Sequence, residues 1–161
     1  MKATLSFALV AVAAVFFMIG RTTAQNSALH QQTLDNLSTA MHGETFAFAK
    51  YNLYAQHARH SGNTQLADLF AKTARVERFQ HFAEEAQLAG LVGSDADNLN
   101  DAIKGETYEV NTMYSDFAKQ AAALGDKAAA DRFEEIRRDE MTHRDAYQAA
   151  LKTLESRQGG N

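Results

Sequence analysis

The chain of 161 residues contains 45% hydrophobic and 22% charged residues, with no proline, tryptophan or cysteine. Its length fits one domain, and the absence of cysteine excludes disulfides, thiolate metal sites, iron–sulfur clusters and a catalytic thiol. The net charge of −4 and the lack of a basic stripe argue against a nucleic-acid partner. Because helix breakers are scarce, the composition favours long helices over a turn-rich β fold.

Residues 1–24 have the features of an export signal. Lys2 precedes an uncharged apolar run over residues 3–20, and small residues up to Ala24 fit a signal-peptidase site. The run is also just long enough to span a bilayer, so an uncleaved membrane anchor is the alternative. Both interpretations predict that the domain over residues 25–161 is exported, periplasmic or extracytoplasmic, and membrane-anchored if the leader is retained.

Beyond the leader, four long periodic segments are separated by short clusters of glycine, serine, asparagine and aspartate, which are common helix stops and caps. The predicted helices cover residues 31–60, 64–89, 97–124 and 127–155. Short connections favour antiparallel neighbours, so the predicted fold is all-α, an antiparallel four-helix bundle. The pattern does not decide whether the helices pair within one chain or exchange between two.

Each predicted helix has an acidic residue in the middle of its apolar stripe. These residues are Glu44 on the first helix, Glu77 on the second, Glu106 and Glu109 on the third, and Glu140 on the fourth. One such glutamate is ordinary as a boundary residue or a surface ion pair. Five unpaired buried carboxylates, however, would outweigh a domain stability of about 5–15 kcal/mol. Since the stripes offer no arginine or lysine, two bound cations would offset this charge.

The types of ligand narrow the choice of metal. Glu140 and His143 form a Glu-x-x-His motif, whose spacing places a carboxylate and an imidazole side by side on a helix. A mixed set of carboxylates and imidazoles without sulfur suits iron or manganese better than copper or a structural zinc.

These motifs resemble the diiron domain of rubrerythrins, in the ferritin-like superfamily, over roughly residues 31–155. The matching segments are Ala-Met-His-Gly-Glu44-Thr, Thr-Ala-Arg-Val-Glu77-Arg, Gly-Glu106-Thr-Tyr-Glu109, Met-Tyr114-Ser-Asp-Phe and Asp-Glu140-Met-Thr-His143-Arg. The resemblance implies two iron ions bound by Glu44, Glu77, Glu106, Glu109, Glu140 and His143. It also places Tyr51 and Tyr114 where the family has tyrosines that hydrogen-bond the ligand carboxylates; core aromatics are the alternative.

The second helix departs from the family pattern. Gln80 occupies the histidine position of the motif, and His81 follows it. His81 still shares a helix face with Glu77 at a spacing of four, and a π-bulge would restore its direction toward the metals. We therefore predict His81 as a ligand, with Gln80 as a weak partner otherwise. Glu84 and Glu85 are interpreted as a solvated turn, of which Glu84 is the residue able to approach the site.

The chain also lacks the cysteines of a rubredoxin module, so it resembles the stand-alone, erythrin-type members. The resemblance implies a non-haem diiron oxidoreductase in a homodimer, which reduces hydrogen peroxide in oxidative-stress defence with electrons from an external donor. A ferroxidase or iron-handling protein that uses oxygen is the alternative. A non-enzymatic metal-binding bundle and a manganese centre with catalase-like activity are the further alternatives.

Overall fold

A computed structural model describes residues 29–158, so the predicted leader and its cleavage site lie outside the described residues. Within residues 29–158 the chain is helical apart from short connections, and this part contains no β-strand. The all-α prediction is confirmed. None of the helices in this range combines the length and the apolar character needed to cross a bilayer.

The first two predicted helices form an antiparallel pair, which we call the N-terminal hairpin. Helix α1 (Gln31–His60) packs along a continuous rod made of α2 (Thr64–Val76), the π-helix η1 (Glu77–His81) and α3 (Phe82–Ala89). The turn between them ends at Asn63, whose side chain accepts a hydrogen bond from the backbone N–H of Leu66 and so caps α2.

The last two predicted helices form a second antiparallel pair, the C-terminal hairpin. Here the first rod consists of α4 (Asp95–Tyr108), the π-helix η2 (Glu109–Met113) and α5 (Tyr114–Leu124), and it packs against α6 (Lys127–Gln158). Gly125 ends α5 with a φ of 85°, in the left-handed region that glycine enters without steric cost.

The connection between the hairpins, residues 90–94, is held by hydrogen bonds at both ends. Gly90 ends α3 in the left-handed conformation, and Ser94 begins α4 in a reciprocal capping box with Asp97. The Asn98 side chain also forms two hydrogen bonds with the backbone of Gly93. Its Oδ1 atom accepts from the Gly93 N–H at 2.9 Å, and its Nδ2 atom donates to the Gly93 carbonyl at 3.1 Å. The connection therefore has a defined conformation that sets the direction in which α4 leaves α3.

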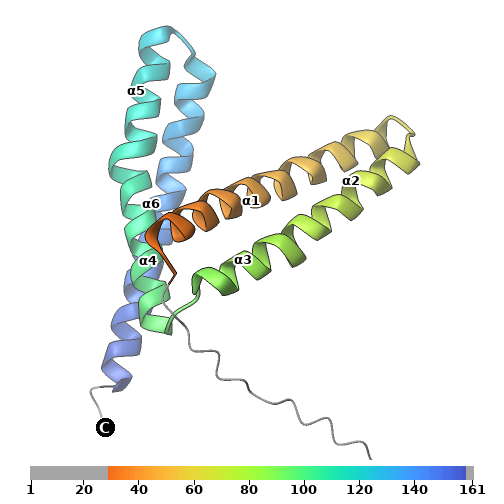
Figure 1. Cartoon of the computed structure of the whole chain (residues 1–161). Helices are drawn as coiled ribbons and strands as arrows, with labels where there is room; N and C mark the ends of the chain where they lie inside the picture. The colour runs from red at the N-terminus through yellow and green to blue at the C-terminus, as the bar shows by residue number, and fades with distance from the viewer. Residues whose placement is uncertain (1–28, 159–161) are drawn as a thin grey trace, which may run out of the picture.

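The two hairpins diverge from this connection, as Figure 1 shows. No Cα atom in the helices of the N-terminal hairpin lies within 8 Å of a Cα atom in the helices of the C-terminal hairpin. The four antiparallel helices that the sequence predicts are therefore present, and they pair two by two. The structure shows which helices pair within each hairpin. It does not show the helices of one hairpin packed against those of the other.

Each hairpin buries only the narrow strip where its two rods touch. The buried hydrophobic side chains of the described residues are small, apart from two. They are Met41, Val110 and the alanines at positions 55, 58, 67, 74, 118, 121 and 130. Larger residues of the predicted stripes stay exposed, including Leu66 at 38%, Phe117 at 41% and Tyr147 at 37%. Alanine lets the two rods approach closely, and the bulkier apolar residues stay partly exposed, because no further helix among residues 29–158 covers them.

Candidate metal centre

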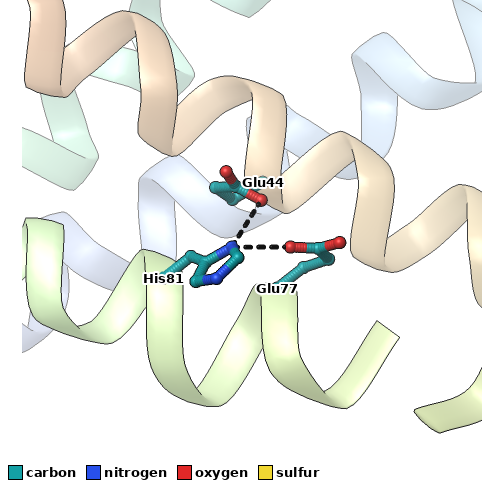
Figure 2. Close-up of side chains that lie close together, drawn as sticks. All are labelled: Glu44, Glu77 and His81. Atoms are coloured by element: carbon teal, nitrogen blue, oxygen red, sulfur yellow. Dashed lines mark ion pairs between the residues drawn. The ribbon is translucent and has the colours of Figure 1, made fainter. Parts of the chain in front are cut away.

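In the N-terminal hairpin, α1 and η1 bring Glu44, Glu77 and His81 together (Figure 2). The His81 Nδ1 atom lies 2.8 Å from the Glu77 Oε2 atom and 3.6 Å from the Glu44 Oε2 atom. One ligand atom from each of the three residues lies within 4.8 Å of the other two. Two carboxylates and one imidazole thus converge on one small volume.

The π-helix η1 gives His81 its direction. The backbone N–H of Phe82 donates to the Glu77 carbonyl, five residues back, so the helix holds one extra residue in this turn. The π-bulge considered from the sequence is present, and His81 faces Glu77 and Glu44. Gln80 is exposed and lines a surface hollow with Lys72. The structure therefore places the imidazole, and not the Gln80 amide, beside the carboxylates.

The C-terminal hairpin holds a second group of the same composition, made of Glu106 on α4 with Glu140 and His143 on α6. The His143 Nδ1 atom lies 2.7 Å from the Glu140 Oε2 atom, and the ligand atoms of this group also lie within 4.8 Å of one another. Glu109 is not a member of the group, but burial raises the pKa of its carboxyl and the nearby charge of Glu140 raises it further.

The carboxylates of both groups repel one another. Burial and a hydrogen bond with the Glu77 carboxyl raise the pKa of Glu44 above its ordinary value of 4.5. Burial and a hydrogen bond with Glu140 raise the pKa of Glu106 in the same way, and the charge of Glu109 adds to the shift. Each group therefore favours an extra positive charge, which a proton or a metal cation can supply.

Two carboxylate oxygens in the described residues are buried and have no hydrogen-bond partner. One is the Oε2 atom of Glu106, inside the second group, and the other is the Oε2 atom of Glu85. The charge of Glu85 also raises the pKa of Glu44, whereas Glu84 is exposed. The sequence interpretation of this turn is thus wrong, because Glu85 is the residue that approaches the site. Its spacing of four from His81 is the signal that could have identified it.

These residues fit the predicted cofactor. In zinc sites, carboxylate oxygens and imidazole nitrogens lie roughly 2.0–2.2 Å from the metal ion. With similar distances for other first-row metals, two ligand atoms of one ion are at most about 4.4 Å apart. The ligand atoms of each group lie within 4.8 Å of one another, an upper bound close to this limit. The unpartnered Glu106 oxygen and the mutual repulsion of the carboxylates are both relieved by a cation. Each group therefore provides three donors for one ion.

The two predicted tyrosines differ in their surroundings. Tyr114 is close enough to Glu109, Glu140 and Glu106 that their charges, together with burial, raise the pKa of its hydroxyl. The ring of Tyr51 packs against Tyr54 and Phe70, at centroid distances of 6.2 and 6.1 Å. The structure thus brings Tyr114 to the second group, and it places Tyr51 in an aromatic cluster of the N-terminal hairpin.

The sequence predicts that carboxylates from all four helices converge inside the bundle around a pair of ions. In this chain they form two groups, one on each hairpin, and no group of the described residues combines ligands from both hairpins. The difference arises because helix periodicity fixes which residues share a face, whereas the relative placement of the hairpins depends on the short connection between them.

Comparison with known proteins identifies the family. The rubrerythrin family model matches residues 35–82 and 78–151. This chain belongs to the rubrerythrin family. It is 32% identical to nigerythrin of Nitratidesulfovibrio vulgaris over 137 residues, which cover 77% of this chain and 68% of the relative. It is 33% identical to rubrerythrin of Porphyromonas gingivalis over 147 residues, which cover 84% of this chain and 74% of the relative.

A solved structure of fully reduced, all-ferrous nigerythrin aligns with 96% of this chain and 81% of that chain, at 31% identity and a TM-score of 0.40. Rubrerythrins and nigerythrin are diiron proteins, and this chain has two groups of residues able to hold iron. The predicted family and diiron cofactor are therefore confirmed, and the chain is a rubrerythrin-family diiron protein of the oxidoreductase type.

Proposed function

We propose that this protein reduces hydrogen peroxide to water, with two electrons that the iron pair supplies and an external donor restores. The overall step consumes one peroxide, two protons and two electrons, and it yields two molecules of water. The observation that supports it best is the matched pair of carboxylate–imidazole groups, in a chain whose family is rubrerythrin. Three donors in each group leave other coordination positions of an ion available to a small oxidant.

The side chains of the chain have separate tasks in this proposal. Glu44, Glu77 and His81 bind one ion, and the second group binds the other, with Glu109 as an additional carboxylate beside Glu140. Tyr114 orients the ligand carboxylates of the second group by hydrogen bonding, a role supported by its closeness to them. The donor of the electrons is another protein or a small molecule, since this sequence has no cysteine to hold a rubredoxin-type iron.

A stopped-flow comparison tests the proposal against the ferroxidase alternative. We expect the anaerobically prepared ferrous protein to be oxidised by hydrogen peroxide at least about tenfold faster than by an equal concentration of oxygen, a barrier difference of about 1.4 kcal/mol. Equal rates would instead favour the iron-handling function. A protein that binds iron but reacts with neither oxidant would be a structural metal-binding bundle.

We also propose that the domain works outside the cytoplasm. The proposal is supported by Lys2, the apolar run over residues 3–20 and the small residues up to Ala24. Amino-terminal sequencing of the protein recovered from cell fractions tests it. A mature chain that begins at Gln25 in the periplasmic or secreted fraction is the expected result. An intact amino terminus in the membrane fraction would show a retained anchor, and an intact cytoplasmic chain would refute export.

A further inference from the structure

The face that carries the metal ligands is open to solvent in both hairpins, because the side chains of His81 and His143 are 50% and 55% exposed. On the N-terminal hairpin, an apolar groove of about 540 Å³ lined by Met41, Phe46 and Phe82 lies beside this face and contains none of the three ligands. On the C-terminal hairpin, a groove of about 610 Å³ is lined by Ala102 and Tyr147, one turn before Glu106 and one turn after His143. Since no helix among residues 29–158 covers either face, each hairpin presents half of a bundle core together with half of the ligands.

The connections of this chain are too short for a ferritin-like bundle within one molecule. Bundles of this class contain one long crossover, which must return along the length of a helix. The rod from Thr64 to Ala89 has 13, 5 and 8 residues in its three parts, so it is about 39 Å long at 1.5 Å per residue. The longest connection between rods, residues 90–94, reaches at most about 18 Å when fully extended.

The same connection permits only an up-and-down closure, in which the chain reverses sharply and α4 returns antiparallel to α3. The hydrogen bonds at the connection oppose that reversal. Asn98 holds the Gly93 backbone through two hydrogen bonds, and the Ser94–Asp97 capping box fixes the start of α4, so that α4 is directed away from the N-terminal hairpin (Figure 1). A second molecule can cover the apolar faces without disturbing these contacts.

We propose that a second copy of this chain completes the metal centre by exchange of hairpins. The N-terminal hairpin of each protomer packs against the C-terminal hairpin of the other, which gives a closed dimer with two four-helix bundles. Each bundle contains one diiron centre, with Glu44, Glu77 and His81 from one copy facing Glu106, Glu140 and His143 from the other. The inference rests on the metal centre and does not depend on the oxidant that the centre reduces.

Complementation between two defective variants tests the exchange. One variant is E77Q/H81Q, which damages the N-terminal hairpin, and the other is E140Q/H143Q, which damages the C-terminal hairpin. In an exchanged heterodimer both damaged hairpins share one bundle, and the other bundle is entirely wild type. Doubly tagged heterodimers should then retain about half of the iron of the wild-type dimer after dialysis against a chelator, while each variant alone retains about a tenth or less.

A matched control combines two variants that are damaged in the same hairpin, E77Q/H81Q and E44Q. Exchange leaves both bundles of this heterodimer defective, so its retained iron should stay at the level of the single variants. The proposal is overturned if the test pair retains no more iron than this control pair, because the ligands of each centre would then come from one chain. It is also overturned if the wild-type protein is a monomer with two tightly bound iron ions.

An insertion into the connection supplies a readout that needs no metal. A flexible Gly/Ser segment of about 25 residues after Val92 gives the crossover enough length to span a helix rod. We expect this insertion to convert the dimer into a monomer in sedimentation measurements, with the iron content per chain unchanged. The same segment added after Gln158 is the control and should leave the dimer intact. A dimer that persists with the lengthened connection would overturn the exchange.

Discussion

The carboxylates of the metal centre should lower the thermal stability of the metal-free protein and raise that of the iron-loaded protein. The variant Glu106→Gln separates the two effects. Two carboxylates about 4 Å apart repel by about 4 kcal/mol at an effective dielectric constant of 20, and by about 1 kcal/mol in water. Because Glu106 is only partly buried beside Glu140, we take the lower figure. Removing the Glu106 charge at pH 7.5 should therefore raise the Tm of the metal-free protein by about 3 °C.

Iron should reverse this order of stability. An ion present at 100 times its Kd stabilises the wild type by about 2.7 kcal/mol. The variant replaces one charged donor of the second group with a neutral amide, so its affinity should fall by at least tenfold, which removes about 1.4 kcal/mol or more of that gain. The measurement is anaerobic thermal unfolding at low salt, with chelator and with ferrous iron.

The matched control for this experiment is Glu84→Gln, which changes an exposed glutamate of α3 that belongs to neither group. Its Tm should follow the wild type in both conditions. Two results would refute the reasoning. A lower Tm of the metal-free Glu106→Gln protein would mean that this carboxylate stabilises the fold, and an undiminished gain from iron would mean that it is not a ligand.

Three further predictions concern individual side chains. His81→Ala should lower the iron retained after dialysis by at least about tenfold while Gln80→Ala leaves it unchanged, because only the imidazole faces the carboxylates; equal losses in metal analysis would contradict this placement. The raised pKa of Glu44 and of His143 stabilises the metal-free fold at low pH, and this contribution is lost as the pH rises through each raised pKa. The Tm of the metal-free protein should therefore fall between about pH 5 and pH 8, and a flat profile would count against these shifts. Tyr114→Phe should retain its iron but reduce peroxide about tenfold more slowly, a barrier change of about 1.4 kcal/mol, in single-turnover kinetics; an unchanged rate would remove the tyrosine from the proposed mechanism.

The elements of the fold follow from local rules that act along the chain. Breaker clusters at 61–63 and 125–126 end helices close to the predicted positions, because a glycine or a capping side chain acts within one turn of its own position. The start of α4 differs from the prediction by only two residues, because Ser94 caps the helix and α4 begins at Asp95 instead of residue 97. The types of metal ligand are equally local, since Glu-x-x-His places its two side chains together on any helix.

The details of the site needed the structure. The sequence alone could not choose between Gln80 and His81, because one extra residue in a helical turn rotates every later side chain by about 100°. The π-helix η1 decides the matter in favour of His81, and it also turns Glu85 toward Glu44. A strict helical period of 3.6 residues across this turn predicted that Glu84 approaches the site, whereas Glu84 is exposed.

The sequence by itself determined four helical rods, at least one carboxylate on each of them and the family to which they belong, because these properties depend on spacing within a few turns. The tertiary structure decided that the rods pair into two diverging hairpins, and that the ligands divide into two groups of three. The physical reason is the connection over residues 90–94. Its length and its hydrogen bonds govern how elements distant in sequence meet, and no helical periodicity carries that information.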